Sequence, residues 1–166
     1  KIEDNAFASC KKLKEITIPK KVQTIRWCAF ANCRKLSKIK FESDNKVYIE
    51  FGIFQNCVNL KSVTMPNFYI EELNVGGNFE GCKLLNSVYI PSYVQEIPAH
   101  DFMDCPNLKS VTIPSTVKKI GKQAFGYVYY GKNYKIKKVS GFTIKGKKGS
   151  AAYKYAKKNG FEFVAI

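Results

Sequence analysis

One short pattern recurs through most of the chain and constrains its fold more than any other feature. A phenylalanine returns in steps of 23 to 25 residues, at Phe7, Phe30, Phe54, Phe79, Phe102 and Phe125. A cysteine follows each of the first five phenylalanines by three residues, and a leucine follows each cysteine by three more. Because a unit this short cannot bury its apolar side alone, the repetition predicts a solenoid in which each unit packs on its neighbours.

Each leucine opens a Leu-x-x-hydrophobic-x-hydrophobic segment, as in Leu108, Val111 and Ile113. Apolar residues at every second position indicate a β-strand, and stacked units are expected to align these strands in a parallel sheet. Proline cannot donate to a strand ladder and marks the expected strand ends at Pro19, Pro66, Pro91 and Pro114. A second apolar pair follows at Val22/Ile25, Val47/Ile49, Ile70/Leu73, Val94/Ile97 and Val117/Ile120. The Ala-Phe-x-x-Cys stretch predicts a turn or 3₁₀ piece on the opposite side.

The unit resembles the BspA-type leucine-rich repeat of bacterial cell-surface proteins. The clearest copy runs from Leu108 to Phe125, and the resemblance covers residues 1 to about 126. We therefore expect a β-rich leucine-rich repeat solenoid of about six coils, in the α/β repeat class. It would have a parallel β-sheet on one face, an irregular or 3₁₀ convex side and a C-terminal helix–strand cap. Ile2 corresponds to Ile25, so the chain starts inside a unit and the natural protein is expected to continue upstream.

The pattern changes after Phe125, where residues 127–135 form an insert rich in tyrosine and lysine. We expect a sixth strand around Val139, Phe142 and Ile144. Ser150 is a suitable N-cap for a helix from Ala151 to Lys158, Gly160 is a suitable stop, and residues 161–166 predict a final strand. The expected division is a repeat region at 1–126 and a divergent last repeat with a cap at 127–166.

Five of the six cysteines occupy one repeat position and are expected to form a structural ladder: Cys10, Cys33, Cys57, Cys82 and Cys105. Buried free thiols are the favoured interpretation, because side chains pointing inward in parallel suit a disulfide poorly. Disulfides and a metal site remain alternatives, although Cys28 and Cys33 lack the usual ligand spacing. Cys28 itself falls at an outer, variable position with Asn5, Gly52, Gly77, His100 and Gln123 as its equivalents.

No catalytic motif stands out in the sequence. His100 is the only histidine, it precedes Asp101, and its repeat position is an outer one, so a surface histidine is the favoured interpretation. The sequence holds no Gly-rich phosphate loop, paired-carboxylate motif or nucleophile elbow. We therefore expect a non-catalytic protein without a cofactor or metal.

The solvent-facing strand positions form the candidate binding face. Small hydroxyl residues are the most frequent at these positions. The ten positions are Glu15, Thr17, Lys38, Lys40, Ser62, Thr64, Ser87, Tyr89, Ser110 and Thr112. The sixth strand is expected to add Gly141 and Thr143. One interpretation is a broad polar docking surface; the other is that serine and threonine are simply tolerated on a solvated sheet.

The net charge of +15 is concentrated near the C-terminus, since no acidic residue lies between Asp104 and Glu162. The candidate polyanion patch comprises Lys132, Lys135, Lys137, Lys138, Lys145, Lys147 and Lys148. Uncompensated lysine attracts polyanions, but base readout favours arginine, which this stretch lacks, so specific nucleic-acid binding is not expected. A solvated lysine surface without a ligand is the alternative.

The resemblance implies a secreted or cell-surface bacterial protein that binds protein or glycan, with adhesion as its role. The partner would be a host or bacterial surface protein or a polysaccharide, and the chain is expected to be a monomer. A structural spacer without its own ligand and a polyanion-binding protein acting through the lysine-rich end remain alternatives. No apolar run reaches the ~18–20 residues that a membrane-spanning helix needs.

Overall fold

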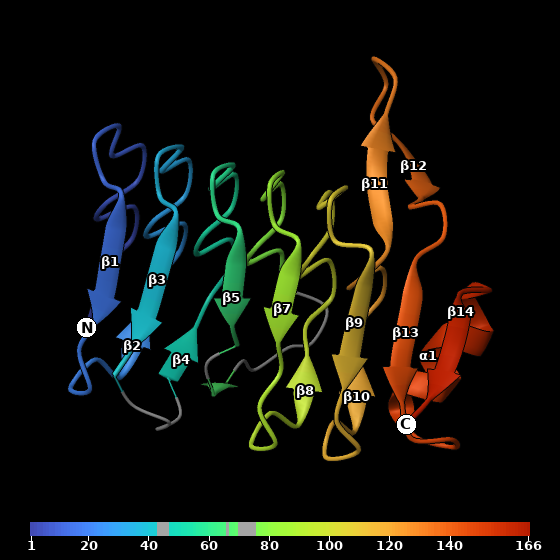
Figure 1. The fold of residues 1–166 in the computed structure, drawn as a ribbon. Coiled ribbons are helices and arrows are strands. Elements are labelled where there is room, and N and C mark those ends of the chain that lie inside the picture. The colour runs from blue at the N-terminus through green and yellow to red at the C-terminus, as the bar shows by residue number, and fades with distance from the viewer. Residues whose placement is uncertain (43–46, 66, 70–75) are drawn as a thin grey trace.

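The computed structural model is a parallel β-solenoid of about six turns with one helix near the C-terminus, as the repeat predicted (Figure 1). It describes residues 1–42, 47–65, 67–69 and 76–166. Pro66 and the expected apolar pair Ile70 and Leu73 lie outside these ranges. The predicted leucine-rich repeat fold is confirmed, while the division at residue 126 stays a prediction.

One strand of each coil contributes to a row that runs along the solenoid (Figure 1). The row contains β1 (Glu15–Ile18), β3 (Lys38–Phe41), β5 (Ser62–Thr64), β7 (Ser87–Tyr89), β9 (Ser110–Ile113) and β13 (Thr143–Gly146). Parallel ladders join β1 to β3, β5 to β7 and β9 to β13. Side chains along each strand alternate between the two faces of the sheet, so the apolar residues point toward the core and the polar residues toward solvent.

The opposite side is more regular than expected. Among the described residues it carries five short strands: β2 (Thr24–Ile25), β4 (Val47–Ile49), β6 (Phe68–Tyr69), β8 (Glu96–Ile97) and β10 (Lys119–Ile120). Parallel ladders join β2, β4 and β6, and β8 and β10. In four units the second apolar pair contributes to such a strand, through Ile25, through Val47 and Ile49, through Ile97 and through Ile120. Ile25, Ile49 and Ile97 are buried there.

The phenylalanines form a continuous stack through the core. Neighbouring ring centroids lie 5.1, 5.2, 5.6, 5.2 and 4.8 Å apart from Phe7 to Phe125, with nearly parallel planes. All are buried except Phe7, which is 40% exposed at the first coil. Equivalent leucines line the same core at Leu36, Leu60, Leu85 and Leu108. Coil-to-coil burial of these columns supplies the main stabilisation of the solenoid.

The turns around each phenylalanine contain 3₁₀-type hydrogen bonds, such as Cys33 N to Phe30 O, but no described residue continues them into a 3₁₀ helix. The backbone is left-handed two residues before each phenylalanine: Asn5 (φ 55°), Cys28 (52°), Gly52 (66°), Gly77 (74°), His100 (57°) and Gln123 (53°). A residue with a Cβ is strained there, so the position that looked merely variable has a backbone requirement.

The insert after Phe125 folds as an antiparallel hairpin of β11 (Tyr127–Tyr130) and β12 (Lys135–Lys138), which projects beyond the neighbouring coils (Figure 1). After β13 comes α1 (Ala151–Asn159), and β14 (Glu162–Ala165) then pairs parallel to β13. The expected caps of the helix are confirmed. The Ser150 side chain accepts from Tyr153 N, and Gly160 is left-handed with φ 64°.

Candidate binding surfaces

All ten strand positions predicted as the candidate binding face are exposed. Parallel register places them in rows, with Thr17 beside Lys40 and Thr64 beside Tyr89. Glu15 and Lys38 form an ion pair of 3.8 Å, but both side chains are about two-thirds exposed, so the pair contributes little to stability. The face is therefore available to a ligand along the described length of the strand row.

The sixth strand has a different register from the one expected. Thr143 pairs with Ser110 and Lys145 with Thr112, whereas the sequence pattern placed Gly141 and Thr143 at these positions. Gly141 instead lies in a turn with φ 67°, and Phe142 N donates to Val139 O at 3.3 Å. The turn delays the strand by two residues, so Lys145 joins the strand row.

A groove opens on this face where β7, β9 and the end of β13 come together. Its volume is about 730 Å³, which is in the size range of small-ligand sites. We call it the strand-face groove; its lining includes Ser87, Tyr89, Thr112, Pro114, Lys147 and Ile166. β7 and β9 are both described and lie side by side, yet no ladder joins them, and the groove follows that interruption (Figure 1).

Tyr89 is the most suitable contact residue of the strand-face groove. Its side chain is 65% exposed, Ser87 lies two residues earlier on the same strand, and Thr112 of β9 also lines the groove. An amphipathic ring bordered by hydroxyls suits the apolar face of a sugar or a peptide side chain. Lys147 adds one positive charge. The arrangement offers aromatic contact and hydrogen bonding.

The seven lysines of the candidate polyanion patch do not gather at one place. Lys132, Lys135, Lys137 and Lys138 belong to the hairpin, which projects away from the side of the molecule where the C-terminus lies (Figure 1). Lys145, Lys147 and Lys148 lie on or after β13, at the end of the strands where the C-terminus also lies (Figure 1). In the hairpin, Lys137 Nζ sits 5.4 Å from the ring centre of Tyr130. The charge is therefore divided between two surfaces.

The five repeated cysteines lie in one column, and all six thiols of the chain are free. Each buried thiol donates to the carbonyl of a phenylalanine in the previous coil, as Cys33 Sγ does to Phe7 O at 3.0 Å and Cys105 Sγ to Phe79 O at 3.3 Å. Burial raises the pKa of Cys57 to about 12. These thiols stay protonated near neutral pH, which suits a structural column.

Cys28 and His100 lie at the left-handed position of their coils. Cys28 is half-buried, and burial followed by the charge of Asp4 raises the pKa of its thiol. His100 Nε2 lies 3.0 Å from Gln123 Oε1, within hydrogen-bond distance. Within the described ranges, no group of three or more histidine, cysteine, aspartate or glutamate side chains is arranged to hold a metal ion.

Sequence reasoning overlooked Asp101, which is fully buried beside the phenylalanine stack. Its Oδ1 accepts from the backbone N and the Nδ2 of Asn78, at 3.1 and 2.8 Å. Its Oδ2 has no partner in the described part of the chain. Burial raises the pKa of this carboxyl to about 7, against the opposing effect of the two hydrogen bonds. The only hint in the sequence was that Asp101 places a charge at the repeat position just before the phenylalanine, where the other coils have alanine, isoleucine or asparagine.

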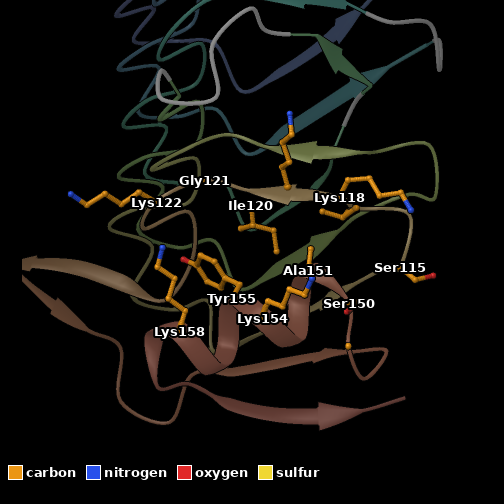
Figure 2. Close-up of a pocket in the computed structure, with 13 residues that line it drawn as sticks. Ser115, Lys118, Ile120, Gly121, Lys122, Ser150, Ala151, Lys154, Tyr155 and Lys158 are labelled. Carbon is orange, nitrogen blue, oxygen red and sulfur yellow. The ribbon is translucent and has the colours of Figure 1, made fainter.

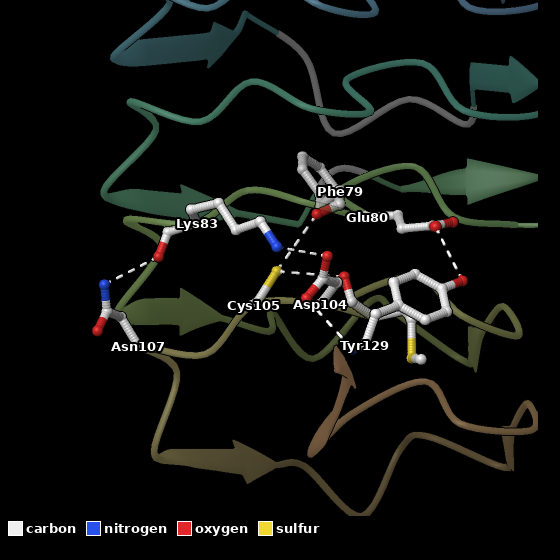
Figure 3. A network of polar contacts seen from close by, with 8 residues as sticks. Phe79, Glu80, Lys83, Asp104, Cys105, Asn107 and Tyr129 are labelled. Atoms are coloured by element: carbon white, nitrogen blue, oxygen red, sulfur yellow. Dashed lines mark hydrogen bonds and ion pairs between the residues drawn. The ribbon is translucent and has the colours of Figure 1, made fainter. Parts of the chain in front are cut away.

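A second overlooked network attaches the hairpin to the coils (Figure 3). The Tyr129 hydroxyl donates to Glu80 Oε1 at 3.1 Å, Tyr129 N donates to Asp104 Oδ1 at 3.4 Å, and Lys83 pairs with Asp104. Burial, and then the charge of Glu80, raises the pKa of Tyr129 to about 12. The contacts join three successive coils and explain why the insert holds a fixed position.

Comparisons with known proteins agree with the repeat. Residues 1–132 match the family described as BspA type Leucine rich repeat region, in six copies. No curated protein matches the chain. No helix in the described ranges combines the length and apolar character needed to cross a membrane.

Two solved structures are similar to the chain. The first is a leucine-rich repeat protein from T. pallidum, with 22% identity over 86% of this chain and 50% of that protein, at a TM-score of 0.46. The second is a leucine-rich cell surface protein from Faecalibacterium prausnitzii A2-165, with 18% identity over 87% of this chain and 57% of that protein, at a TM-score of 0.49. The chain thus spans half or slightly more of each protein.

Proposed function

Because the chain belongs to the BspA-type leucine-rich repeat family, we propose that it is a non-catalytic binding module of a secreted or cell-surface bacterial protein. Its ligand is a protein or glycan on a host or bacterial surface, and its role is adhesion. The surface location rests on the resemblance to repeats of bacterial surface proteins. The contact site is the strand-face groove, and the observation that carries the proposal is the exposed Tyr89 within it.

The chemistry of the groove supports a ligand with mixed character. Tyr89 offers an aromatic face, and Ser87 and Thr112 offer hydroxyl donors and acceptors. Aromatic residues surrounded by small polar residues are typical of contact surfaces that rely on a few anchors. On one side of the groove β7 pairs with β5, and on the other β9 pairs with β13, so each wall is supported by a neighbouring strand.

The alternative is a spacer whose neighbouring domains do the binding. A solenoid built from one repeated unit can serve as a rod without any ligand of its own. Under that alternative, large substitutions anywhere on the strand face leave the function of the whole protein unchanged.

The test is binding of the chain to a panel of immobilised extracellular-matrix proteins and neutral polysaccharides at physiological salt. Thr112→Arg places a long charged side chain in the groove, whereas Thr17→Arg makes the same change on the first strand of the same face. We expect Thr112→Arg to weaken binding at least ten-fold and Thr17→Arg to change it less than two-fold. No binding to any panel member, or equal effects of the two variants, would overturn the proposal in favour of the spacer.

A further inference from the structure

A second groove lies between the last coils and the C-terminal helix (Figure 2). Its walls are the segment around β10 and one side of α1, and its volume is about 690 Å³. Apolar residues form the inner part: Val117 and Tyr155 are buried, and Ile120 is half-buried. We call it the β10–α1 groove. It shares only Ser115 with the strand-face groove and contains none of the predicted patch lysines.

Positive charge lines this groove from both walls. Five lysines contribute, and all are exposed: Lys118, Lys119, Lys122, Lys154 and Lys158. Lys119 pairs with Glu96 at 3.3 Å, and it is the one lysine of the five with an ion pair among the described residues. The lining residues, all within the described ranges, contain no carboxylate. Four exposed lysines that line one groove without an ion pair in the described part of the chain attract anions.

The charges are spread along the groove. Figure 2 shows Lys122 and Lys158 at one end, Lys118 and Ser115 at the other, and Tyr155 between the two ends. A single small anion would contact only one end. A linear ligand with repeated charges can contact both ends. Because lysine carries a point charge on a flexible side chain, each lysine can pair with a different anionic group of such a ligand.

The groove does not suit nucleic acid. Base stacking needs an exposed aromatic face, but the groove's aromatic residue, Tyr155, is buried. Its hydroxyl donates to Phe125 O at 3.0 Å and accepts from Phe125 N at 3.1 Å, so it is committed to the backbone. The lining also contains no arginine, which base readout favours. The remaining chemistry is recognition of oxyanions on a polymer without bases.

We propose that the β10–α1 groove binds a linear anionic glycan whose charge is carried by sulfate or phosphate groups. Lys122 and Lys158 hold one anionic group and Lys118 and Lys154 hold others, while the sugar rings pass over the half-buried Ile120. The site is independent of the strand-face groove, so it can be correct where the adhesive role proposed above is wrong.

The test uses the whole chain and two triple variants that each remove three positive charges. One is Lys122→Gln, Lys154→Gln and Lys158→Gln in the groove. The matched control is Lys132→Gln, Lys135→Gln and Lys137→Gln in the hairpin. The probe is a sulfated dextran oligosaccharide, with neutral dextran as the blank. Thermal unfolding of each variant checks that these exposed substitutions leave the fold intact.

We expect the groove variant to bind sulfated dextran at least ten-fold more weakly than wild type, and the hairpin variant to stay within three-fold. The salt dependence of binding should also become shallower in the groove variant alone, by about one unit of slope for each lost contact. Equal losses in the two variants would mean unspecific attraction to net charge and would overturn the site. So would an absence of binding to any polyanion at low salt.

Two further probes identify the source of the charge. If sulfated dextran binds more tightly than inorganic polyphosphate, the preferred anionic group is sulfate; if polyphosphate binds more tightly, it is phosphate. Either result supports the site, provided that binding depends on the groove lysines. Binding of an oligothymidylate of equal charge as tightly as both would overturn the exclusion of nucleic acid and with it the proposal.

Discussion

Asn78 donates from its Nδ2 to Asp101 Oδ1 at 2.8 Å, and both side chains are fully buried in adjacent coils. The other oxygen of Asp101 has no partner in the described ranges. The repeat position that Asp101 occupies holds alanine in three other coils, at Ala6, Ala29 and Ala124. This coil therefore has a buried carboxyl at a position where the other coils have an uncharged residue. Ionisation of that carboxyl makes the solenoid less stable, because a buried charge is poorly solvated.

We predict that Asp101 makes stability depend on pH. Its pKa is about 7 in the folded chain, against 3.8 for an ordinary aspartate, so the folded state binds more protons between these values. The contribution of Asp101 to stability is then fully present below pH 3.8 and is lost as pH rises toward 7. Asp101→Asn removes the titration and keeps an acceptor for Asn78. Its stability relative to wild type should increase from pH 5 to pH 8.

Urea unfolding of the two proteins at both pH values measures this difference. The exposed Glu42→Gln serves as the control for a general loss of negative charge. If the difference between Asp101→Asn and wild type is the same at pH 5 and pH 8, the carboxyl titrates normally and the account of its burial is wrong.

The phenylalanine stack predicts unequal costs for the same substitution at different coils. Phe102 is buried and stacks on Phe79 at 5.2 Å and on Phe125 at 4.8 Å. Phe102→Ala should therefore lower the free energy of unfolding by ~3–5 kcal/mol. Phe7 is 40% exposed, so Phe7→Ala should cost less than half as much. Chemical denaturation measures both, and equal costs would contradict a core formed by stacked coils.

The left-handed position predicts a stabilising substitution. Cys28 has φ 52° and pays ~1–2 kcal/mol for a conformation that glycine adopts freely. Glycine loses more conformational freedom on folding, by ~0.5–1 kcal/mol, so the net gain of Cys28→Gly should be about 0.5–1 kcal/mol. The reverse change, Gly77→Ala at φ 74°, should destabilise, because a side chain is strained in this left-handed conformation. Thermal unfolding under reducing conditions tests both signs; destabilisation by Cys28→Gly would be the contrary result.

Tyr155 connects α1 to the last repeat, and its removal should loosen the C-terminal segment. Tyr155→Phe leaves the buried N–H and carbonyl of Phe125 without their hydroxyl partner, which should cost ~1–3 kcal/mol. Tyr134, 75% exposed in the hairpin, provides the control substitution to phenylalanine. Hydrogen exchange at the Phe125 amide should accelerate in Tyr155→Phe alone. Unchanged exchange there would show that the helix is held by other contacts.

The repeat spacing predicted the solenoid because identical side chains one coil apart must stack. The columns of phenylalanine and leucine follow from position alone, as does the alternation of β9, where Val111 and Ile113 are buried between exposed neighbours. The caps of α1 were also predictable, since Ser150 and Gly160 have local backbone and side-chain preferences that do not depend on the rest of the fold.

Other features depend on contacts that no periodicity reveals. The register of β13 differs by two residues from the one that the sequence predicted, because Gly141 lies in a turn and the strand begins only at Thr143. The hairpin at 127–138 has a glycine-containing loop between two short strands, which is the usual sequence signal of a hairpin. This signal was masked by the many tyrosines and lysines of the segment. The β10–α1 groove joins lysines more than thirty residues apart, such as Lys122 and Lys158, so it exists only once α1 docks beside β10.

If the strand-face groove is the contact site of a binding module, removal of its exposed tyrosine must weaken binding more than removal of a similar tyrosine elsewhere. Tyr89 and Tyr134 are 65% and 75% exposed, so Tyr89→Ala and Tyr134→Ala remove similar surface from the groove and from the hairpin. The measurement is the affinity of each variant for the panel member that wild type binds most tightly at physiological salt. We predict at least a ten-fold loss for Tyr89→Ala and less than a two-fold change for Tyr134→Ala. Unchanged binding by Tyr89→Ala, or the larger loss with Tyr134→Ala, would contradict the account.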